Sequence, residues 1–434
     1  MANHPTTCLL ILLIFHSIFL QSRACHPTDR EALLDFKRRI TADPLGLLHS
    51  WIPDKDCCTT WKGIACEPST GRVLNLTRPG RSWESDSGPI DTEMTGTLSP
   101  FIGNLSSLQV LDLSNLKELK GHIPFELGKL TNLRYMFLGS NSLEGSIPSS
   151  IEGLSLLQTL ALDRNRLTGP IPQNLFNKMT SLSTLSLDEN MLCGRIPPSI
   201  GKLVELRYLY FAGNNFSGIV PESIGRLQNL VDLDMSRNQL AGPIPNSIGN
   251  LSNLRLFSMS HNRLSGSIPP SIGNMKSLKI LGISDNALSG PIPNSIGNLQ
   301  RVVTVFMGYN NLSGNIPTII GNMTTLRFIY LSNNNFTGEI PPTLFRLEKL
   351  IELDLSTNGL SSPIPPQVGA MGSLSRLILS HNPLGGKIPE SLGKLGNLFA
   401  LELQGNGLSG EIPKELAEAK NMGIVKLSEN GLSG

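Results

Sequence analysis

Residues 251–274 read LSNLRLFSMSHNRLSGSIPPSIGN, which is one complete copy of a frame that recurs along the chain, LxxLxxLxLxxNxLxGxIPxxIGN. The frame returns every 24 residues, except for one step of 25 between Asn165 and Asn190. Fixed periodicity of this kind predicts a solenoid, in which each unit buries its apolar face only against its neighbours. The asparagine of the frame stands at Asn141, Asn165, Asn190, Asn214, Asn238, Asn262, Asn286, Asn310, Asn334, Asn358, Asn382, Asn406 and Asn430.

The physical role of each position follows from the frame. The xLxLxx segment predicts a short strand whose alternating leucines point inward. The chain must then turn, and a buried asparagine there offers donors and an acceptor that bridge from one coil to the next. Glycine in the LxG step permits tight backbone geometry, and the residue before the proline of the IP step is extended.

Three adjacent asparagines at positions 333–335 receive three different roles on this frame. Asn334 is predicted to be the buried asparagine that bridges coils. Asn333 is expected on the exposed face of the strand, and Asn335 begins the glycosylation sequon Asn-Phe-Thr.

Composition narrows the class of function. The chain has 434 residues and a formal net charge of +2, which argues against a nucleic-acid or anionic-membrane surface as its main partner. Glycine and proline are frequent while hydrophobic content is ordinary, a combination typical of many regularly spaced turns.

The first 24 residues are typical of a secretory signal peptide. The apolar run from Cys8 to Leu20 is too short to span a bilayer. Small residues at Ser22 and Ala24 occupy the positions that precede a cleavage site. No later apolar run reaches the length of about 18 residues that a membrane span needs, so a membrane anchor would have to come from a segment missing from this sequence.

Four cysteines frame the N-terminal region, and a fifth, Cys193, stands apart and is expected to be a free thiol. Cys57 and Cys58 are adjacent, with Cα atoms about 3.8 Å apart, which is too close for a disulfide between them. We expect the pairs Cys25–Cys57 and Cys58–Cys66. The alternative of four zinc thiolates is disfavoured by the adjacency and by an oxidising compartment.

The repeat frame resembles that of the plant-specific leucine-rich repeat family over nearly the whole mature chain. The segment CHPTDREALLDFKRRI, with Trp51, DCCTTWKGIAC and GRVLNL after it, resembles the N-terminal cap of that family. Thr28 and Glu31 are expected to form a capping box for an amphipathic helix that carries Leu33 and Phe36. The resemblance implies an α/β solenoid: a right-handed superhelix, or horseshoe, with a parallel concave β-sheet, short 3-10 or irregular convex turns and a disulfide-bonded helical cap.

The expected domains are a signal peptide at 1–24, the cap at 25–70 and the repeat array at 71–434. A polar insertion at 77–95 interrupts the first repeat, and the second has Leu116 where asparagine is expected. The chain stops at Gly434 inside a repeat, and we expect it to be a fragment of a longer protein.

The predicted concave face is the candidate binding face, because all five tyrosines fall on it. Phenylalanine, in contrast, also occupies repeat positions outside this face. Tyrosine is a frequent anchor at interfaces, with an apolar body and a polar tip. The predicted ligand-binding groove is roughly 24 Å long, from the repeat of Asn214 to that of Asn334. It comprises Tyr208, Tyr210, Asp232, Asp234, Phe306, Tyr309, Phe328 and Tyr330.

Catalysis finds little support in the sequence. His261 and His381 share a repeat position, but five coils or about 24 Å separate them, so they cannot share a metal ion. Asp163, Asp188 and Glu189 fall on adjacent coils and are expected to form a hydrated acidic patch. No phosphate-binding glycine loop or kinase motif occurs. We expect no enzyme, no catalytic residue, no cofactor and no metal site.

Two functions compete. The first is the ectodomain of a receptor-like protein or receptor kinase that binds a protein or peptide ligand, and to which a co-receptor is a further candidate partner. The second is a cell-wall inhibitor that resembles polygalacturonase-inhibiting proteins and whose partner is a cell-wall-degrading enzyme. Some peptide receptors of the family carry an Arg-x-Arg pair on a concave strand, which no strand has here. Both functions place the protein outside the cell.

Seven sequons accompany the secretory signal, and we expect most of them to be used. They begin at Asn75, Asn104, Asn215, Asn250, Asn311, Asn322 and Asn335.

Overall fold

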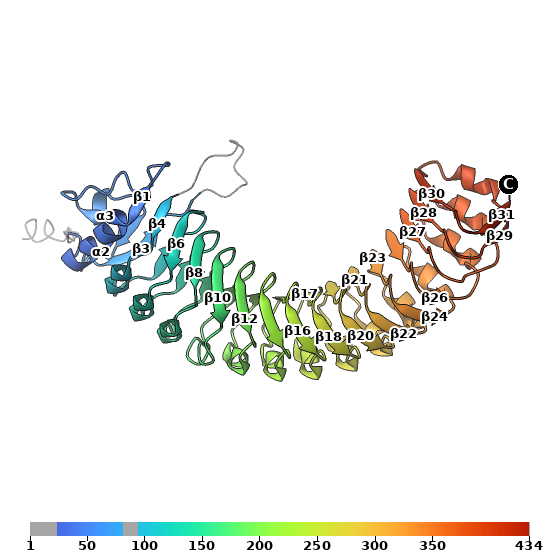
Figure 1. Cartoon of the computed structure of the whole chain (residues 1–434), viewed down its shortest axis with the longest axis horizontal. Helices are drawn as coiled ribbons and strands as arrows, with labels where there is room; N and C mark the ends of the chain where they lie inside the picture. Colours follow the sequence, from blue (N-terminus) through green and yellow to red (C-terminus); the bar gives the residue numbers. More distant parts are fainter. Residues whose placement is uncertain (1–23, 81–93, 434) are drawn as a thin grey trace, which may run out of the picture. The chain divides into compact units, whose positions relative to one another are not determined.

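The computed structural model describes residues 24–80 and 94–433. Contacts divide the chain into two compact units, 1–168 (unit 1) and 169–434 (unit 2). The signal peptide predicted for 1–24 lies outside the described residues apart from Ala24, and so does most of the predicted loop 77–95. Figure 1 shows that both units are built from successive coils of short strands and turns.

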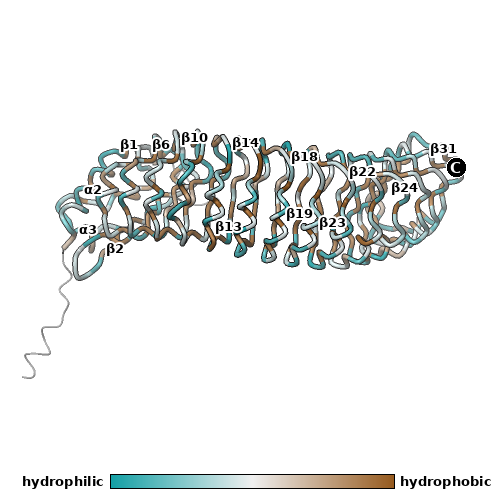
Figure 2. The backbone as a smooth tube through the Cα atoms, turned by 90° about the horizontal axis from the view of Figure 1, so that it is seen from below, coloured by the Kyte–Doolittle hydropathy of each residue, from teal (hydrophilic) through white to brown (hydrophobic). Residues whose placement is uncertain are grey.

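Residues 251–274 form one coil of the solenoid. The coil contains strand β17 (Leu256–Ser258), strand β18 (Arg263–Gly266) and the 3-10 helix η7 (Pro270–Asn274). Its apolar frame positions, among them Phe257, Leu264 and Ile272, are fully buried. Hydrophobic and hydrophilic stretches therefore alternate along every coil, as Figure 2 shows. The fold predicted from the frame, a leucine-rich repeat solenoid with a parallel sheet and 3-10 turns, is confirmed.

Unit 2 contains one long parallel ladder of three-residue strands and a second series of short strands beside it. Neighbouring strands pair in phase, so that Tyr208 faces Asp232 and Asp232 faces Leu256. Equivalent residues of successive repeats therefore line up in rows. The ladder comprises β11 (Thr184–Ser186), β13 (Tyr208–Tyr210), β15 (Asp232–Asp234), β17, β19 (Ile280–Gly282), β21 (Thr304–Phe306), β23 (Phe328–Tyr330), β25 (Glu352–Asp354), β27 (Arg376–Ile378), β28 (Ala400–Glu402) and β30 (Ile424–Lys426).

The second series of strands in unit 2 follows the frame asparagines, except at Asn382, and a 3-10 helix closes the coil. These strands are β12 (Met191–Gly194), β14 (Asn215–Gly218), β16 (Gln239–Gly242), β18, β20 (Ala287–Gly290), β22 (Asn311–Gly314), β24 (Asn335–Gly338), β26 (Gly359–Leu360), β29 (Ser409–Glu411) and β31 (Gly431–Ser433). The 3-10 helices are η4 (Pro198–Lys202), η5 (Glu222–Arg226), η6 (Asn246–Asn250), η7, η8 (Asn294–Asn298), η9 (Thr318–Asn322), η10 (Pro342–Arg346), η11 (Pro366–Ala370), η12 (Glu390–Lys394) and η13 (Lys414–Glu418).

Unit 1 carries the cap and the first coils. Its cap hairpin pairs β2 (Ile64–Cys66) antiparallel with β3 (Val73–Thr77), and β3 starts a parallel ladder with β5 (Val110–Asp112), β7 (Tyr135–Phe137) and β9 (Thr159–Ala161). The second series runs through β1 (Ile40–Ala42), β4 (Thr95–Thr97), β6 (Leu119–His122), β8 (Ser142–Gly145) and β10 (Arg166–Pro170). The 3-10 helices are η1 (Pro100–Asn104), η2 (Phe125–Lys129) and η3 (Ser149–Gly153).

The frame asparagines bridge the coils as predicted. The Asn334 side chain is buried, and its Nδ2 donates to the carbonyl of Met307 in the preceding coil at 3.0 Å and to that of Leu331 in its own coil at 3.1 Å. Its Oδ1 accepts from the backbone N–H of Leu312 at 3.0 Å. Each such residue thus satisfies backbone groups at the turn that neighbouring strands leave unpaired.

Two further hydrogen-bond ladders were not predicted. A serine at the start of the 3-10 turn donates its hydroxyl to a carbonyl of the preceding coil, as Ser247 does to Glu222 at 2.7 Å and Ser271 to Asn246 at 2.7 Å. A second asparagine, between the turn and the strand, donates to the preceding coil in the same way, as Asn253 does to Gln228 at 2.9 Å. The sequence shows these residues as repeats, but they lie on the exposed side, where a polar residue is also expected without a hydrogen-bonding role.

The residue immediately before the frame asparagine does not lie on the strand face, contrary to the prediction. Asn333 was expected on the strand face, and Tyr309, His261 and His381 were placed there too. In the structure all four have a left-handed backbone, with φ between 54° and 57°, and lie in the bend after the strand. The chain must leave the strand sharply to bring the asparagine inward, and the left-handed region makes that reversal.

The cap is built around helix α2 (Pro27–Arg38), which buries Ala32, Leu33 and Phe36. The predicted capping box is absent: the N-cap is His26, without a side-chain cap hydrogen bond, and Pro27 occupies the first turn. Proline suits that position because its fixed φ matches the helix and its missing N–H has no helical partner there. The helix thus begins before Thr28, and Glu31 pairs with Arg38 at 2.5 Å instead.

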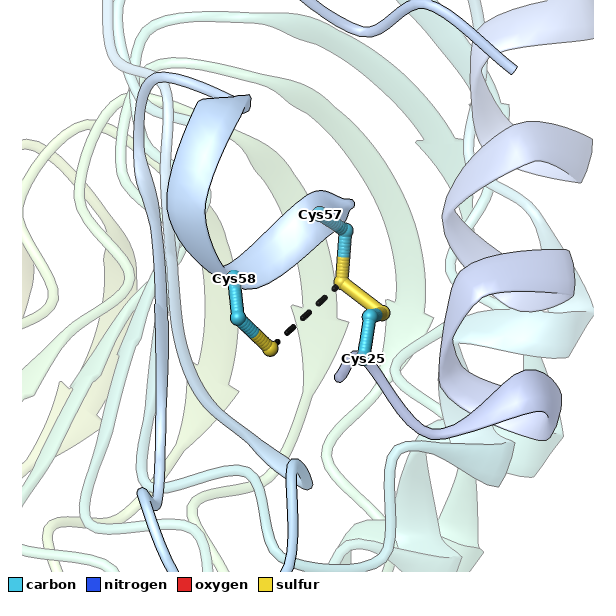
Figure 3. Close-up of side chains that lie close together, drawn as sticks. All are labelled: Cys25, Cys57 and Cys58. Atoms are coloured by element: carbon cyan, nitrogen blue, oxygen red, sulfur yellow. Dashed lines mark hydrogen bonds between the residues drawn. A yellow bond between two sulfur atoms is a disulfide. The ribbon is translucent and has the colours of Figure 1, made fainter. Parts of the chain in front are cut away.

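The cap cysteines form the disulfides Cys25–Cys57 and Cys58–Cys66, the same pairs that the sequence favours. The short helix α3 (Cys57–Thr60) carries both adjacent cysteines, and Asp56 caps it by accepting from the N–H of Cys58 at 2.9 Å. Figure 3 shows Cys57 bonded to Cys25 while the Cys58 sulfur lies 3.9 Å from that of Cys57. Sulfurs in disulfides are not thiolates, so this cluster is not a zinc site.

Candidate ligand-binding face

The strand ladder of unit 2 presents two rows of outward positions, interrupted at Gly282, which is buried and has no side chain. In β13, β15, β17 and β23 the middle residue is buried and the first and third residues are half-buried. We call the first and third residues of the six strands from β13 to β23 the strand face. This is the predicted concave face, and it holds Tyr208, Tyr210, Asp232, Asp234, Leu256, Ser258, Ile280, Gly282, Thr304, Phe306, Phe328 and Tyr330.

An aromatic pair closes one end of the strand face. Phe306 on β21 and Tyr330 on β23 are direct partners in the ladder, and their rings stack with centroids 5.0 Å apart. Phe306 remains 38% exposed, whereas the middle residue of its strand, Val305, is 6% exposed. Burial, followed by the nearby carboxylate of Glu352, raises the pKa of Tyr330 to about 12, so its hydroxyl stays a hydrogen-bond donor at neutral pH.

A tyrosine pair beside two aspartates forms the other end. Tyr208 and Tyr210 stack with ring centroids 6.5 Å apart and face Asp232 and Asp234 on β15. The Tyr210 hydroxyl donates to Asp232 Oδ2 at 3.1 Å, and burial together with the Asp232 charge raises the pKa of Tyr210. Asp234 accepts from the backbone N–H of Ser236 at 2.9 Å. The structure thus brings together seven of the eight residues predicted for the groove.

Tyr309 is the exception. It lies in the left-handed bend three residues beyond β21 and is 58% exposed, so it borders the strand face without belonging to the strand. Sequence reasoning also passed over Leu256, Ile280 and Gly282, which continue the face between its two ends. Their repeat positions are the same as those of the tyrosines, so the frame contained the signal, but a search for aromatic and charged residues did not use it.

The sequons lie away from the strand face. Asn104, Asn250 and Asn322 end 3-10 helices, and Asn215, Asn311 and Asn335 begin strands of the second series; all six are exposed. Asn75 differs, because it is half-buried within β3 and pairs with Val110. Cys193, the free thiol, is half-buried in β12.

His261, one of the two histidines considered for a metal site, has an acidic neighbour. His261 Nδ1 lies 3.6 Å from Asp285 Oδ2 in the neighbouring coil; the His261 side chain is exposed and that of Asp285 is half-buried. Within residues 24–80 and 94–433, the disulfide-bonded cap cysteines form the single cluster with metal-ligand geometry. No helix in those residues is long and apolar enough to cross a bilayer.

Family models match most of the chain in separate stretches. The leucine-rich repeat N-terminal domain matches residues 26–67, and the leucine-rich repeat region matches 197–303. Further leucine-rich repeat models match 157–216, 132–154, 325–347, 349–371 and 373–395.

Curated relatives match over short stretches. The DNA damage-repair/toleration protein DRT100 of Arabidopsis thaliana is 34% identical over 136 residues, which are 31% of this chain and 37% of the relative. A polygalacturonase inhibitor of Vitis vinifera is 29% identical over 133 residues, 31% of this chain and 36% of the inhibitor. The matching stretches thus span little more than a third of these relatives.

Solved structures match over longer stretches. A TDR receptor is 33% identical with a TM-score of 0.72, over 78% of this chain and 59% of the receptor. A plant peptide hormone receptor, RGFR1 in complex with RGF2, is 30% identical with a TM-score of 0.61, over 80% of this chain and 66% of that chain. A leucine-rich repeat protein of Leptospira interrogans is 32% identical with a TM-score of 0.64, over 77% of this chain and 82% of that protein.

Proposed function

This chain belongs to the plant leucine-rich repeat family, and we propose that it is an extracellular recognition module that binds a protein or peptide ligand on the strand face of unit 2. The finer proposal is the ectodomain of a receptor-like protein or receptor kinase that acts in signalling or defence. Its similarity to a TDR receptor and to a peptide hormone receptor supports this role.

The observation that carries the proposal is the stacked pair Phe306 and Tyr330 on the outward side of a sheet. Phe306 keeps 38% of its surface exposed although its ring is large and apolar, and such rings supply large contact area to a partner at low entropic cost. The six exposed sequons lie on other surfaces, so glycans would leave this face open. A rigid apolar patch free of glycans is typical of a protein-binding surface.

Alanine substitutions on and off the face test the proposal. We expect Phe306→Ala and Tyr330→Ala each to weaken binding of the secreted protein's partner by about 2 kcal/mol, as removal of central aromatic anchors does elsewhere. Glu339→Ala and Asn294→Ala, which change exposed residues off the strand ladder, serve as controls. Circular dichroism confirms folding, and surface plasmon resonance measures affinity. Equal losses in both groups would place the binding site elsewhere.

The second candidate is a polygalacturonase-inhibitor-like protein, which the similarity to the inhibitor of Vitis vinifera favours. An enzyme assay separates the two proposals. Inhibition of a fungal polygalacturonase by the purified protein at micromolar concentration, abolished by Phe306→Ala, would support the inhibitor and count against a receptor. Full polygalacturonase activity in the presence of the folded protein would support the receptor.

A further inference from the structure

The strand face changes from acidic to apolar along the solenoid. Asp232 and Asp234 on β15 lie near one end, Leu256 and Ile280 follow on β17 and β19, and the stacked aromatic pair lies at the other end. We propose that this face binds an extended peptide with a basic side chain at one position and an aromatic or other large apolar side chain six residues further along. The inference rests on the proposed function and specifies its ligand.

The acidic end is built to receive a cation. Asp232 and Asp234 are the first and third residues of one strand, so both side chains are on the same side of the sheet. No ion pair in the described part of the chain includes either carboxylate. The stacked rings of Tyr208 and Tyr210 lie on the next strand. Carboxylates beside aromatic rings attract lysine or arginine by charge and by cation–π contact.

The neighbouring charges are consistent with this assignment. Arg207 and Arg255 precede β13 and β17 and are exposed at the edge of the ladder, where neither forms an ion pair in the described residues. The second acidic strand, β25, differs because Glu352 already pairs with Arg376 at 3.6 Å. Both carboxylates of β15 thus lack an ion pair in the described part of the chain, whereas on β25 this holds for Asp354 alone, so β15 offers a ligand cation more negative charge.

The spacing between the two ends sets the peptide register. Adjacent strands lie about 4.8 Å apart, so four spacings, or roughly 19 Å, separate the gap between β13 and β15 from that between β21 and β23. An extended peptide advances about 3.3 Å per residue, which makes this distance about six residues. An even number places both side chains on the same side of the peptide, as two anchors on one face require.

The middle of the face leaves room for such a peptide. Gly282 supplies no side chain at the third position of β19, although β13, β15 and β21 carry Tyr210, Asp234 and Phe306 at the equivalent place. A Cβ built on the buried Gly282 would lie 3.3 Å from Ser260 Oγ, a tight contact that requires this hydroxyl to shift by a few tenths of an ångström. We expect Gly282→Phe to obstruct the path, with circular dichroism as the check that the variant folds.

A positional library of capped, extended octapeptides tests the inference on the secreted protein. We expect enrichment of lysine or arginine at one position and of phenylalanine, tyrosine or tryptophan six residues away. Asp234→Asn should lower the preference for the basic residue by about tenfold and leave the aromatic preference, whereas Phe306→Ala should do the reverse. Gly282→Phe should remove both preferences.

Controls separate failure of the inference from failure of the proposed function. Asp354→Asn changes the equivalent residue of β25, and this variant should keep both preferences. If Asp234→Asn misfolds, Asp234→Ser replaces it, because serine is the residue that β17 has at the equivalent position. Enrichment of acidic peptides, or a basic preference that survives loss of Asp234, overturns the inference but leaves the binding face. If no peptide binds but a folded partner still depends on Phe306, the inference alone is overturned; if neither binds there, both are.

Discussion

The three adjacent asparagines at positions 333–335 have three different structural roles. Asn334 is buried and hydrogen-bonds two coils, while Asn333 adopts a left-handed backbone that asparagine tolerates better than most residues. Asn335 is exposed at the start of β24, within a sequon. The buried role and the sequon were predictable from the frame; the left-handed turn was not, because the preceding position also holds Tyr309, Thr357 and two histidines.

Replacing Asn334 with leucine should destabilise the protein by about 1–3 kcal/mol, because the backbone groups of Met307, Leu331 and Leu312 lose their partner in a dry interior. Urea unfolding measures the change. Asn335→Leu is the matched control, with both variants compared after enzymatic removal of glycans. A smaller loss for Asn334→Leu than for the control would contradict the role assigned to the buried asparagine.

The left-handed bend predicts substitutions of opposite sign at one repeat position. Thr357 is exposed with φ of 54°, which is unfavourable for a β-branched residue, so Thr357→Asn should stabilise the protein by about 0.5–1 kcal/mol. Asn333→Ala should destabilise it by a similar amount. Thermal unfolding compares the two variants with the wild type, and a shift of both in the same direction would contradict the explanation.

At the scale of elements, the frame predicted strands and turns well because their period is encoded by buried leucines and isoleucines. The sequence prediction was wrong at the start of the cap helix, where two signals for a helix N-terminus compete. The motif at Thr28 and Glu31 suggested a capping box, yet Pro27 starts the helix earlier. The serine ladder through Ser247 and Ser271 escaped notice because an exposed serine carries no signal of its partner in another coil. The frame asparagines were predicted to bridge coils because they are buried polar residues, a signal that the serines lack.

Two carboxylates of helix α2 should give the stability of the cap opposite dependences on pH. Burial raises the pKa of Asp29, despite its contacts with the Val73 N–H and Arg72. Burial also opposes ionisation of Asp35, but hydrogen bonds from Arg39 and Ser99 outweigh it and lower the pKa of that group. The contribution of Asp29 to the free energy of unfolding is therefore full below the pKa it has in the unfolded chain, and it declines as the pH rises through its folded pKa. The contribution of Asp35 is full above the pKa it has in the unfolded chain, and it is lost as the pH falls through its folded pKa.

Urea unfolding as a function of pH checks these signs. Asp29→Asn keeps an acceptor for Val73, and its stability should fall less than that of the wild type as pH rises from about 4 towards 7. Asp35→Asn should lose the stability that the wild type gains over the acidic range. Identical pH profiles for the two variants would show that the carboxylates do not titrate as their surroundings require.

At the scale of the whole molecule, the sequence placed seven of the eight residues predicted for the groove on one sheet face, because repeat positions translate directly into rows. It could not reveal that Phe306 and Tyr330 stack or that Asp232 forms no ion pair within residues 24–80 and 94–433, because both depend on side-chain geometry across coils. The chemistry proposed for the ligand therefore rests on the structure rather than on the frame.

Glycosylation should depend on where each sequon lies, because six of them are exposed outside the strand ladder and Asn75 lies within it. We expect glycans at the six exposed sequons of protein secreted from plant cells, and little or none at Asn75, whose side chain is half-buried within β3. Mass spectrometry before and after glycosidase treatment, with peptide mapping, determines occupancy at each site. An unchanged mass after treatment would contradict secretion through the glycosylating pathway.

The central claim, that the strand face binds the ligand, is tested most directly by a glycan placed on it. Ser258→Asn creates the sequon Asn-Met-Ser in the middle of the face, on β17. In the control Asn250→Gln, a glycan is removed from the end of η6 in an adjacent turn. With occupancy verified by mass spectrometry, the account predicts that the Ser258→Asn glycoform loses the partner bound by the wild type while Asn250→Gln retains it. Undiminished binding by the fully glycosylated Ser258→Asn protein would contradict the account.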